Sequence, residues 1–173
     1  MKSPEDGCCA GFAIKMMSGK PSILTCEDMV EVYLKDHLAA SGAAVLELGP
    51  GMGHATKPLL ALGAKVYGVE ISSKFRQILA SAFEPAIAAG NLVISGSDAK
   101  ALPIEAASLD AAVGVNVIYF LDPMDEYHKE LARALKPGRL HATRSMHPNV
   151  WQAHACAYHA TCMSHRWRFN LEC

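Results

Sequence analysis

The stretch that decides the fold is Val45-Leu46-Glu47-Leu48-Gly49-Pro50-Gly51-Met52-Gly53-His54. Its first four residues form a short, mostly apolar run that is typical of a buried strand. Three glycines at alternate positions follow, and a helical pattern begins near Thr56. Because glycine has no Cβ, such a strand-to-helix turn lets the backbone approach a ligand closely. We expect the N–H groups at the start of the helix to point at that ligand.

The spacing of these glycines bears on the kind of ligand. A dinucleotide-binding loop has the pattern G-x-G-x-x-G, whereas this series is G-x-G-x-G with His54 in the sixth position. Glu47 adds a carboxylate that suits a cationic ligand better than a pyrophosphate, with a structural cap as the alternative role. A second buried strand, 65–70, ends at Glu70, and a carboxylate in this place can accept both hydroxyls of a ribose. The alternative is that Glu70 is a solvated loop carboxylate.

These features together resemble the first two motifs of class I S-adenosylmethionine-dependent methyltransferases, and most closely the small-molecule, type-11-like domain. The segment Asp98-Ala99-Lys100-Ala101-Leu102-Pro103 resembles the adenine-binding loop of that family. There Asp98 would accept from the exocyclic amine and Ala99 would donate its N–H, although Asp98 could instead cap the next turn. The resemblance implies S-adenosyl-L-methionine as cofactor, bound by Glu47, Gly49, Gly51, Gly53, Glu70, Ile71, Asp98, Ala99 and Asn116.

The segment 108–117 resembles the fourth strand of the family, and the loop after it lies where ligands bind in open α/β sheets. We therefore take Asn116 and Tyr119 as candidate catalytic residues that face the substrate. An Asn can hydrogen-bond a substrate there, and an aromatic face can stabilise a sulfonium cation. Tyr119 and Phe120 could instead be core residues, which is the favoured interpretation for Phe120.

The order of the elements predicts an α/β fold with helices on both faces of a mostly parallel sheet. Strands are expected at 45–48, 65–70, 91–95, 108–116 and 140–145, and helices at 56–62, 74–89 with a break before Pro85, and 123–135. The resemblance implies a three-layer, Rossmann-like doubly wound sheet of order 3-2-1-4-5, plus at most one or two extra edge strands. The C-terminal hairpin of the family is shortened or replaced here. The fifth strand follows a Lys-Pro-Gly turn and is polar, which predicts an edge or near-edge position.

A chain of 173 residues fits one domain. We divide it into a flexible arm (1–22), the cofactor-binding core (23–146) and an atypical tail (147–173) of the same domain. A leading helix over 29–38 covers the sheet, with or without closing over the cofactor. The tail is either a helix followed by an edge strand or an end with little fixed structure. A zinc site is disfavoured, since the spacings match no known finger; its candidate ligands would be His154, Cys156, His159, Cys162 and His165.

The composition excludes some functions. With 19% charged residues and a net charge of −1, the chain has no dominant attraction to nucleic acid or to an anionic membrane. No apolar run approaches the roughly 20 residues of a membrane-spanning helix. Without a secretory signal, the six cysteines are expected to be reduced thiols of a cytoplasmic protein.

The expected function is methyl transfer from S-adenosylmethionine to a small-molecule acceptor by in-line displacement, in which positioning supplies most of the catalysis. If the acceptor is a hydroxyl or an acid, His54 and His141 are the candidates for a general base, and the alternative is that both are ordinary surface or loop histidines. The alternative is a non-catalytic domain that binds the cofactor or a protein partner, and an exposed sheet edge would also permit a homodimer. A nicotinamide-dependent oxidoreductase is disfavoured by the glycine spacing.

Overall fold

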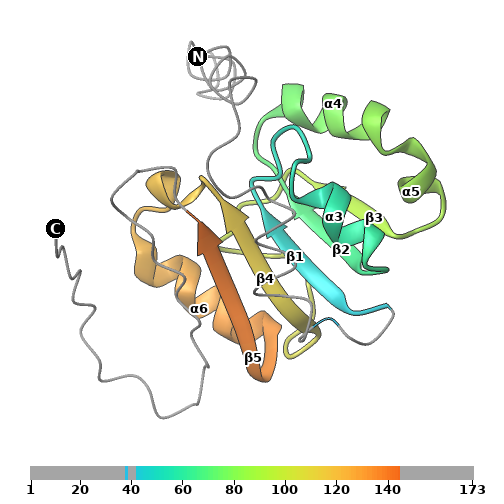
Figure 1. Cartoon of the computed structure of the whole chain (residues 1–173). Coiled ribbons are helices and arrows are strands. Elements are labelled where there is room, and N and C mark those ends of the chain that lie inside the picture. Colours follow the sequence, from blue (N-terminus) through green and yellow to red (C-terminus); the bar gives the residue numbers. More distant parts are fainter. Residues whose placement is uncertain (1–37, 39–41, 145–173) are drawn as a thin grey trace, which may run out of the picture.

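The computed structural model describes residue 38 and residues 42–144, which fold around a parallel sheet (Figure 1). The order of its five strands is β3-β2-β1-β4-β5. The strands are β1 (Ala44–Leu48), β2 (Lys65–Val69), β3 (Leu92–Ser95), β4 (Leu109–Val115) and β5 (Leu135–Arg144). The helices are α3 (Thr56–Ala61), α4 (Ser73–Ala82), α5 (Glu84–Ala88) and α6 (Met124–Ala134), with a 3-10 turn η3 (Ile118–Phe120). The predicted fold class and strand order are confirmed.

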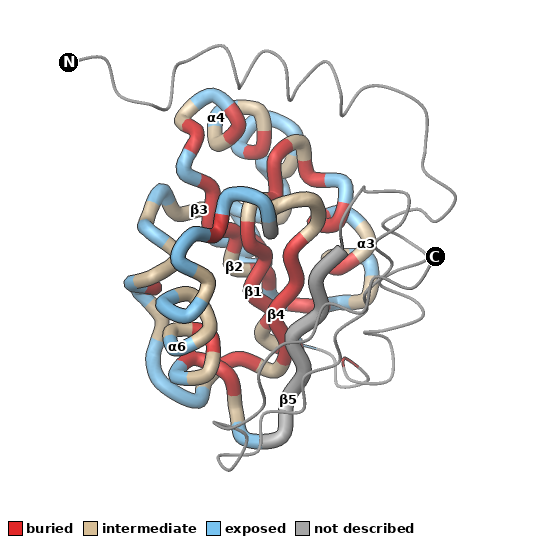
Figure 2. Tube along the Cα trace, turned by 90° about the vertical axis from the view of Figure 1, so that its left-hand side faces the viewer, coloured by how far each residue is buried: buried red, intermediate tan, exposed pale blue. Residues whose placement is uncertain are grey.

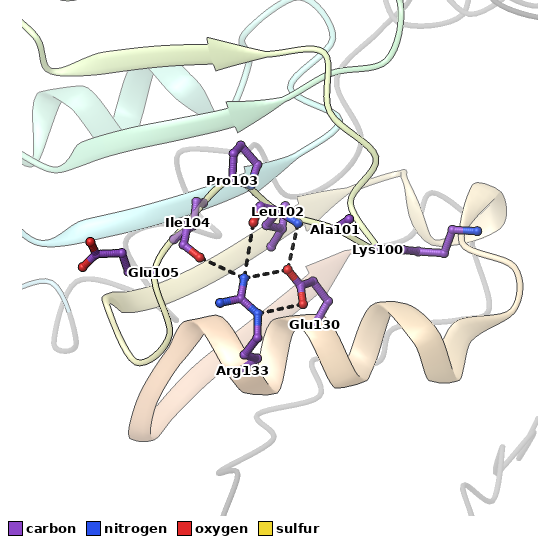
Figure 3. A pocket seen from close by; sticks show the side chains of 8 residues that line it. All are labelled: Lys100, Ala101, Leu102, Pro103, Ile104, Glu105, Glu130 and Arg133. Atoms are coloured by element: carbon purple, nitrogen blue, oxygen red, sulfur yellow. Dashed lines mark hydrogen bonds and ion pairs between the residues drawn. The ribbon is translucent and has the colours of Figure 1, made fainter.

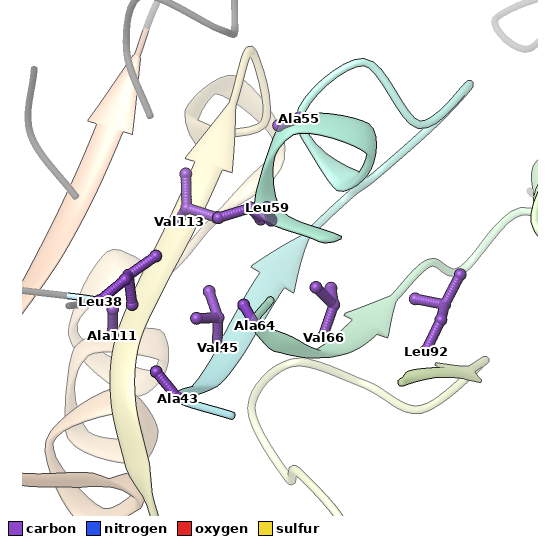
Figure 4. Packing of buried hydrophobic residues seen from close by; sticks show 10 residues of the cluster. All are labelled: Leu38, Ala43, Val45, Ala55, Leu59, Ala64, Val66, Leu92, Ala111 and Val113. Atoms are coloured by element: carbon purple, nitrogen blue, oxygen red, sulfur yellow. The ribbon is translucent and has the colours of Figure 1, made fainter. Parts of the chain in front are cut away.

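The central strands are buried on both faces, which explains their nearly continuous apolar sequence (Figure 2). On one face, Val45 of β1 belongs to a cluster with Leu59 of α3 and Val113 of β4 (Figure 4). On the other face, Leu46 of β1 packs in a cluster that includes Leu131 of α6. Successive residues of β1 point to opposite faces of the sheet, so Val45 packs toward α3 and Leu46 packs toward α6, which gives the three expected layers.

The helix predicted over 74–89 is divided into α4 and α5, as its proline suggested. Ser72 caps the start of α4, because its hydroxyl accepts a hydrogen bond from the Phe75 N–H at 3.4 Å. At Phe83 the backbone leaves the helical conformation, with φ −122° and ψ 25°. Pro85 then lies in the first turn of α5, where its missing N–H costs little.

The start of β5 differs from the prediction. The strand was expected to begin at Leu140 after a turn, but it begins at Leu135, directly after α6. Leu109 pairs with Leu135, whereas Ala111 pairs with Leu140, so residues 136–139 are accommodated as an irregularity in the ladder. Lys136 donates to Asp110 Oδ1 at 2.9 Å and ties this irregular segment to β4. As its polarity predicted, β5 lies at the edge of the described sheet.

Several predictions concern segments outside the described residues. These are the N-terminal arm over 1–22, most of the leading helix, the tail over 147–173 with its extra edge strand, and the candidate zinc ligands. Leu38, at the end of the predicted leading helix, is described and is buried in the cluster on the α3 face. Within the described part of the chain, no helix is long and apolar enough to cross a bilayer. Nor do three or more potential metal ligands gather among these residues.

Candidate functional site

The candidate site lies at the carboxyl ends of three neighbouring strands. The glycine loop follows β1, Glu70 follows β2 and Asn116 follows β4. Strand β1 pairs in parallel with β2 on one side and with β4 on the other, so the direction of chain connection reverses at this point. Ligands of open α/β sheets bind in the crevice formed at such a reversal.

The glycines of the loop are required by backbone conformation and by close packing. Gly49, Gly51 and Gly53 have φ values of +60°, +56° and +85°, in the left-handed region that favours glycine. A Cβ on Gly49 would lie 2.9 Å from Cγ2 of Val117, so the loop after β4 lies directly against the glycine loop. A Cβ on Gly53 would overlap the ring of Phe83. Gly49 therefore belongs to the candidate crevice, whereas Gly53 serves the packing of the α3 start against the end of α4.

The N–H groups of the three loop glycines all donate to acceptors within the protein. Gly49 donates to the Val69 carbonyl at 2.9 Å and Gly53 donates to the Pro50 carbonyl at 2.8 Å. Gly51 donates to Oε2 of Glu70 at 3.0 Å. A turn this tight brings each donor next to an acceptor of the protein itself. The glycines therefore shape the loop after β1, and their N–H groups serve hydrogen bonds within the protein.

Glu70 is buried, so its interpretation as a solvated loop carboxylate is wrong. Only 6% of the residue is exposed, and its two carboxylate oxygens accept from different segments. Oε2 accepts from Gly51 in the glycine loop, and Oε1 accepts from the Ser72 N–H at 2.9 Å, just before α4. Each oxygen keeps a further lone pair. Glu70 therefore stands fixed beside the glycine loop with capacity to accept from a ligand.

Glu47 lies beneath the glycine loop and is 2% exposed. Its Oε2 accepts from the Thr56 hydroxyl at 2.6 Å, which ties the end of β1 to the start of α3. Burial is the main cause that raises the pKa of this carboxyl to about 7, against hydrogen bonds from the Thr56 hydroxyl and N–H that lower it; the charge of Glu70 makes a smaller upward contribution to the same value. A cation bound nearby would favour the ionised form.

Ile71 and Asp98 stand on neighbouring strand exits. Ile71, after β2, is 59% exposed and presents an aliphatic surface to solvent. After β3, Asp98 Oδ1 accepts from the Lys100 N–H at 2.9 Å, so the predicted turn cap is present. Its Oδ2 lies 3.9 Å from the Lys100 ammonium, and the Asp98 side chain is 57% exposed. Capping therefore leaves one oxygen of Asp98 accessible. Ala99, beside it, is partly buried in the α6-side cluster.

The loop after β4 combines a strained residue with exposed aromatic ones. Asn116 has φ +57°, and its Oδ1 is buried without a hydrogen-bond partner in the described part of the chain. Both features cost free energy, and both are common at ligand sites. Tyr119 and Phe120 are 55% and 69% exposed, so the core interpretation is wrong. The reason is that β4 ends at Val115 and the 3-10 turn leaves the sheet.

Comparison with known proteins identifies the family. A family model described as a methyltransferase domain matches residues 46–142, more than half of the chain. The chain belongs to this methyltransferase domain family. The match begins within β1 and ends within β5, so it includes the glycine loop and all the strand exits that form the candidate site.

Individual relatives differ in what they are named for. The probable ribosomal RNA small subunit methyltransferase A of Methanospirillum hungatei is 39% identical over 71 residues, 41% of this chain and 28% of that protein. The sterol 4-C-methyltransferase strm-1 of Caenorhabditis elegans is 28% identical over 93 residues, 54% of this chain and 28% of that protein. The methyltransferase domain thus spans less than a third of the length of these two curated relatives.

The fold of this methyltransferase domain is also that of solved structures. A SAM-dependent methyltransferase from Aquifex aeolicus superposes with a TM-score of 0.61 at 20% identity, and the match covers 76% of this chain and 70% of that one. At this level of identity the similarity concerns the fold.

The sequence analysis missed Arg76 as a residue that supports the site. Its Nη1 donates to the carbonyls of Glu70 and Ile71 at 2.8 and 2.7 Å, which fixes the backbone at the exit of β2. A Cβ on Gly96, just after β3, would lie 2.9 Å from the Arg76 guanidinium carbon. A glycine directly after a strand can indicate such a close approach. Arg76 itself is part of no motif.

The candidate general bases remain predictions. His54, at the end of the glycine loop, is exposed. His141 lies on β5, where the structure describes the backbone alone.

Proposed function

We propose that this domain catalyses methyl transfer from S-adenosylmethionine to an acceptor bound beside Asn116 and Tyr119. The observation that carries the proposal is the arrangement at the sheet reversal. A left-handed glycine loop lies between the fixed carboxylate of Glu70 and Oδ1 of Asn116, for which residues 42–144 provide no hydrogen-bond partner. These groups match a ligand with ribose hydroxyls at one end and hydrogen-bond donors at the other.

The strand exits offer a complementary group for each part of the cofactor. Glu70 would accept from the ribose hydroxyls, and the exposed side chain of Ile71 would cover one face of the adenine. The accessible oxygen of Asp98 would accept from the adenine amine, with the Ala99 N–H donating to the ring. Glu47 would contribute negative charge near the cationic end, beneath the loop formed by Gly49, Gly51 and Gly53. When bound, the cofactor supplies a methyl group already activated by its sulfonium.

The acceptor end of the site is formed by the loop after β4. Asn116 Oδ1 would accept a hydrogen bond from the acceptor or from the cofactor, which would relieve its unsatisfied burial. The exposed ring of Tyr119 would offer an aromatic face to the transferring methyl. Alignment of acceptor, methyl and sulfur would then supply most of the rate acceleration.

The class of acceptor is the finer part of the proposal. We favour a small molecule, because a net charge of −1 provides no general attraction to a phosphate backbone. One relative is named for ribosomal RNA and another for a sterol, so RNA is the alternative that the experiment must include. A domain that binds the cofactor without turnover is the other alternative, since the chain spans only part of its relatives.

Calorimetric titration with S-adenosylmethionine, S-adenosylhomocysteine and NAD tests the cofactor. We expect micromolar binding of the first two and none of NAD, and no binding of either adenosyl ligand would contradict the proposal. Glu70→Gln should weaken binding at least tenfold, because it replaces a carboxylate whose hydrogen bonds contribute roughly 1.5–3 kcal/mol. The exposed Glu105, on the loop before β4, provides the matched control Glu105→Gln, which should bind normally.

Turnover is tested separately with S-adenosylmethionine carrying a labelled methyl group. The label should be transferred to at least one member of a panel of amines, hydroxyl compounds and sterols. Transfer to ribosomal RNA alone would exclude the small-molecule acceptor. Binding without transfer to either class would support the non-catalytic alternative.

A further inference from the structure

The loop that carries Asp98 has little secondary structure of its own. It connects β3 to β4. Residues 98–101 form a turn closed by the bond from the Ala101 N–H to the Asp98 carbonyl at 3.0 Å and by the cap from Asp98 to Lys100, and a second turn follows at residues 106–107. Lys100 lies 3.4 Å from Glu126 of α6, but this pair is exposed and therefore weak. On its N-terminal side Asp98 is held by the end of β3, where the Ser97 N–H donates to the Ser95 hydroxyl at 3.2 Å; on its C-terminal side its position depends on how the following residues are held.

Two side chains of α6 hold those residues (Figure 3). Glu130 Oε1 accepts from the Leu102 N–H at 2.7 Å. Arg133 Nη2 donates to the Ile104 carbonyl at 2.8 Å and, at 3.3 Å, to the Leu102 carbonyl. The loop backbone is therefore bound at successive polar groups by side chains of a helix that packs on the sheet.

Glu130 and Arg133 also bind each other. Arg133 donates from Nε to Glu130 Oε2 at 2.8 Å and from Nη2 to Oε1 at 2.6 Å, a bidentate arrangement of fixed geometry. The Glu130 side chain is only 13% exposed. The guanidinium of Arg133 lowers the pKa of this carboxyl, so Glu130 stays ionised at neutral pH. A depression of about 600 Å³ lies between the loop and α6, and these two residues help to line it.

We propose that Glu130 and Arg133 are positioning residues for adenine recognition: they fix Leu102 and Ile104, and through the adjoining turn they set the place of Asp98 and Ala99. The proposal rests on the proposed function. Neither residue needs to touch the cofactor, since Leu102 is joined to Asp98 through the bonded turn of residues 98–101.

The test compares two ligands that differ at the adenine amine. S-adenosylhomocysteine carries the amine that Asp98 would accept from, whereas S-inosylhomocysteine carries an oxygen there, which a carboxylate repels. Wild type should prefer the adenosyl ligand. In Arg133→Ala the affinity for S-adenosylhomocysteine should fall about threefold to tenfold, and the preference over the inosyl ligand should shrink.

Conservative variants keep the test valid if the alanine variant does not fold. Arg133→Lys retains the charge but cannot bind both carboxylate oxygens and the loop carbonyls, so it should lose discrimination as well. Glu130→Gln should act in the same direction, because one of its amide N–H groups would face another donor. The exposed Lys129 lies on the same helix, and Lys129→Ala is the matched control that should retain both affinity and preference.

A double mutant distinguishes an effect of Arg133 on the position of Asp98 from an effect on the stability of the fold. If Arg133 acts through Asp98, then Arg133→Ala should change the ligand preference little in an Asp98→Ala background. Unchanged preference in all folded variants of Glu130 and Arg133, which includes an equal loss of affinity for both ligands, would overturn the inference. Failure of wild type to bind S-adenosylhomocysteine would overturn the proposed function instead.

Discussion

At the scale of single residues, Glu47 links the candidate site to pH. Burial raises the pKa of its carboxyl from 4.5 to about 7 in the folded protein. Between these values the folded state holds a proton that the unfolded state has lost, so stability falls as the pH rises through this range. The loss amounts to something on the order of 3 kcal/mol. Above pH 7 both states are ionised and the contribution stays constant.

Glu47→Gln should remove this pH dependence, because the amide keeps an acceptor for Thr56 and does not ionise. Urea unfolding between pH 5 and pH 8 should show the variant gaining stability relative to wild type as the pH rises. The exposed Glu105 provides the control Glu105→Gln, whose curve should run parallel to that of wild type. A parallel curve for Glu47→Gln would mean that the buried carboxyl ionises near its ordinary pKa.

At the scale of elements, Gly53 sets how closely α3 packs against the end of α4. In Gly53→Ala the left-handed backbone alone costs about 1–2 kcal/mol, and overlap with the Phe83 ring should add about 1–3 kcal/mol. Gly90→Ala is the matched control, since Gly90 has φ +72° and nothing within 4 Å of its added Cβ. Chemical denaturation should show Gly53→Ala to be the less stable variant. Equal losses would mean that Phe83 moves aside without cost.

The helices and strands also show how much of the fold could be predicted from the sequence. Apolar runs and glycine breaks predicted the strands of this parallel sheet, because burial on both faces leaves few other sequences possible. The start of β5 was missed, since Lys136 contacts Asp110, which lies on another strand and follows no local pattern. Phe120 was placed in the core, although the strand was expected to end at residue 116, because hydrophobicity does not reveal which side chains of a loop face solvent.

The candidate site was predictable to a similar extent. Glu70 and the glycine loop lie together as expected, because strand order decides which carboxyl ends are neighbours. The internal use of the glycine N–H groups was not predicted, nor were the supports supplied by Arg76, Glu130 and Arg133. These depend on side chains that meet across the fold, and sequence spacing does not encode such contacts.

At the scale of the whole molecule, the proposed cofactor would touch the exits of β1, β2, β3 and β4 at once. A ligand bound in this way stabilises the folded state as a unit, by about 2.7 kcal/mol at a concentration one hundred times its Kd. For a domain of this size that corresponds to a rise in Tm of about 5–10 °C. Thermal unfolding with S-adenosylhomocysteine should show this rise, and NAD should produce none.

Glu70→Gln makes the thermal experiment specific to the site. This variant should unfold at a lower temperature than wild type, because its amide N–H2 faces the N–H of Gly51 or of Ser72. Its Tm should then respond weakly to S-adenosylhomocysteine at the same concentration, since the group that would hold the ribose is altered. An equal rise in the variant and in wild type would place the ligand away from Glu70.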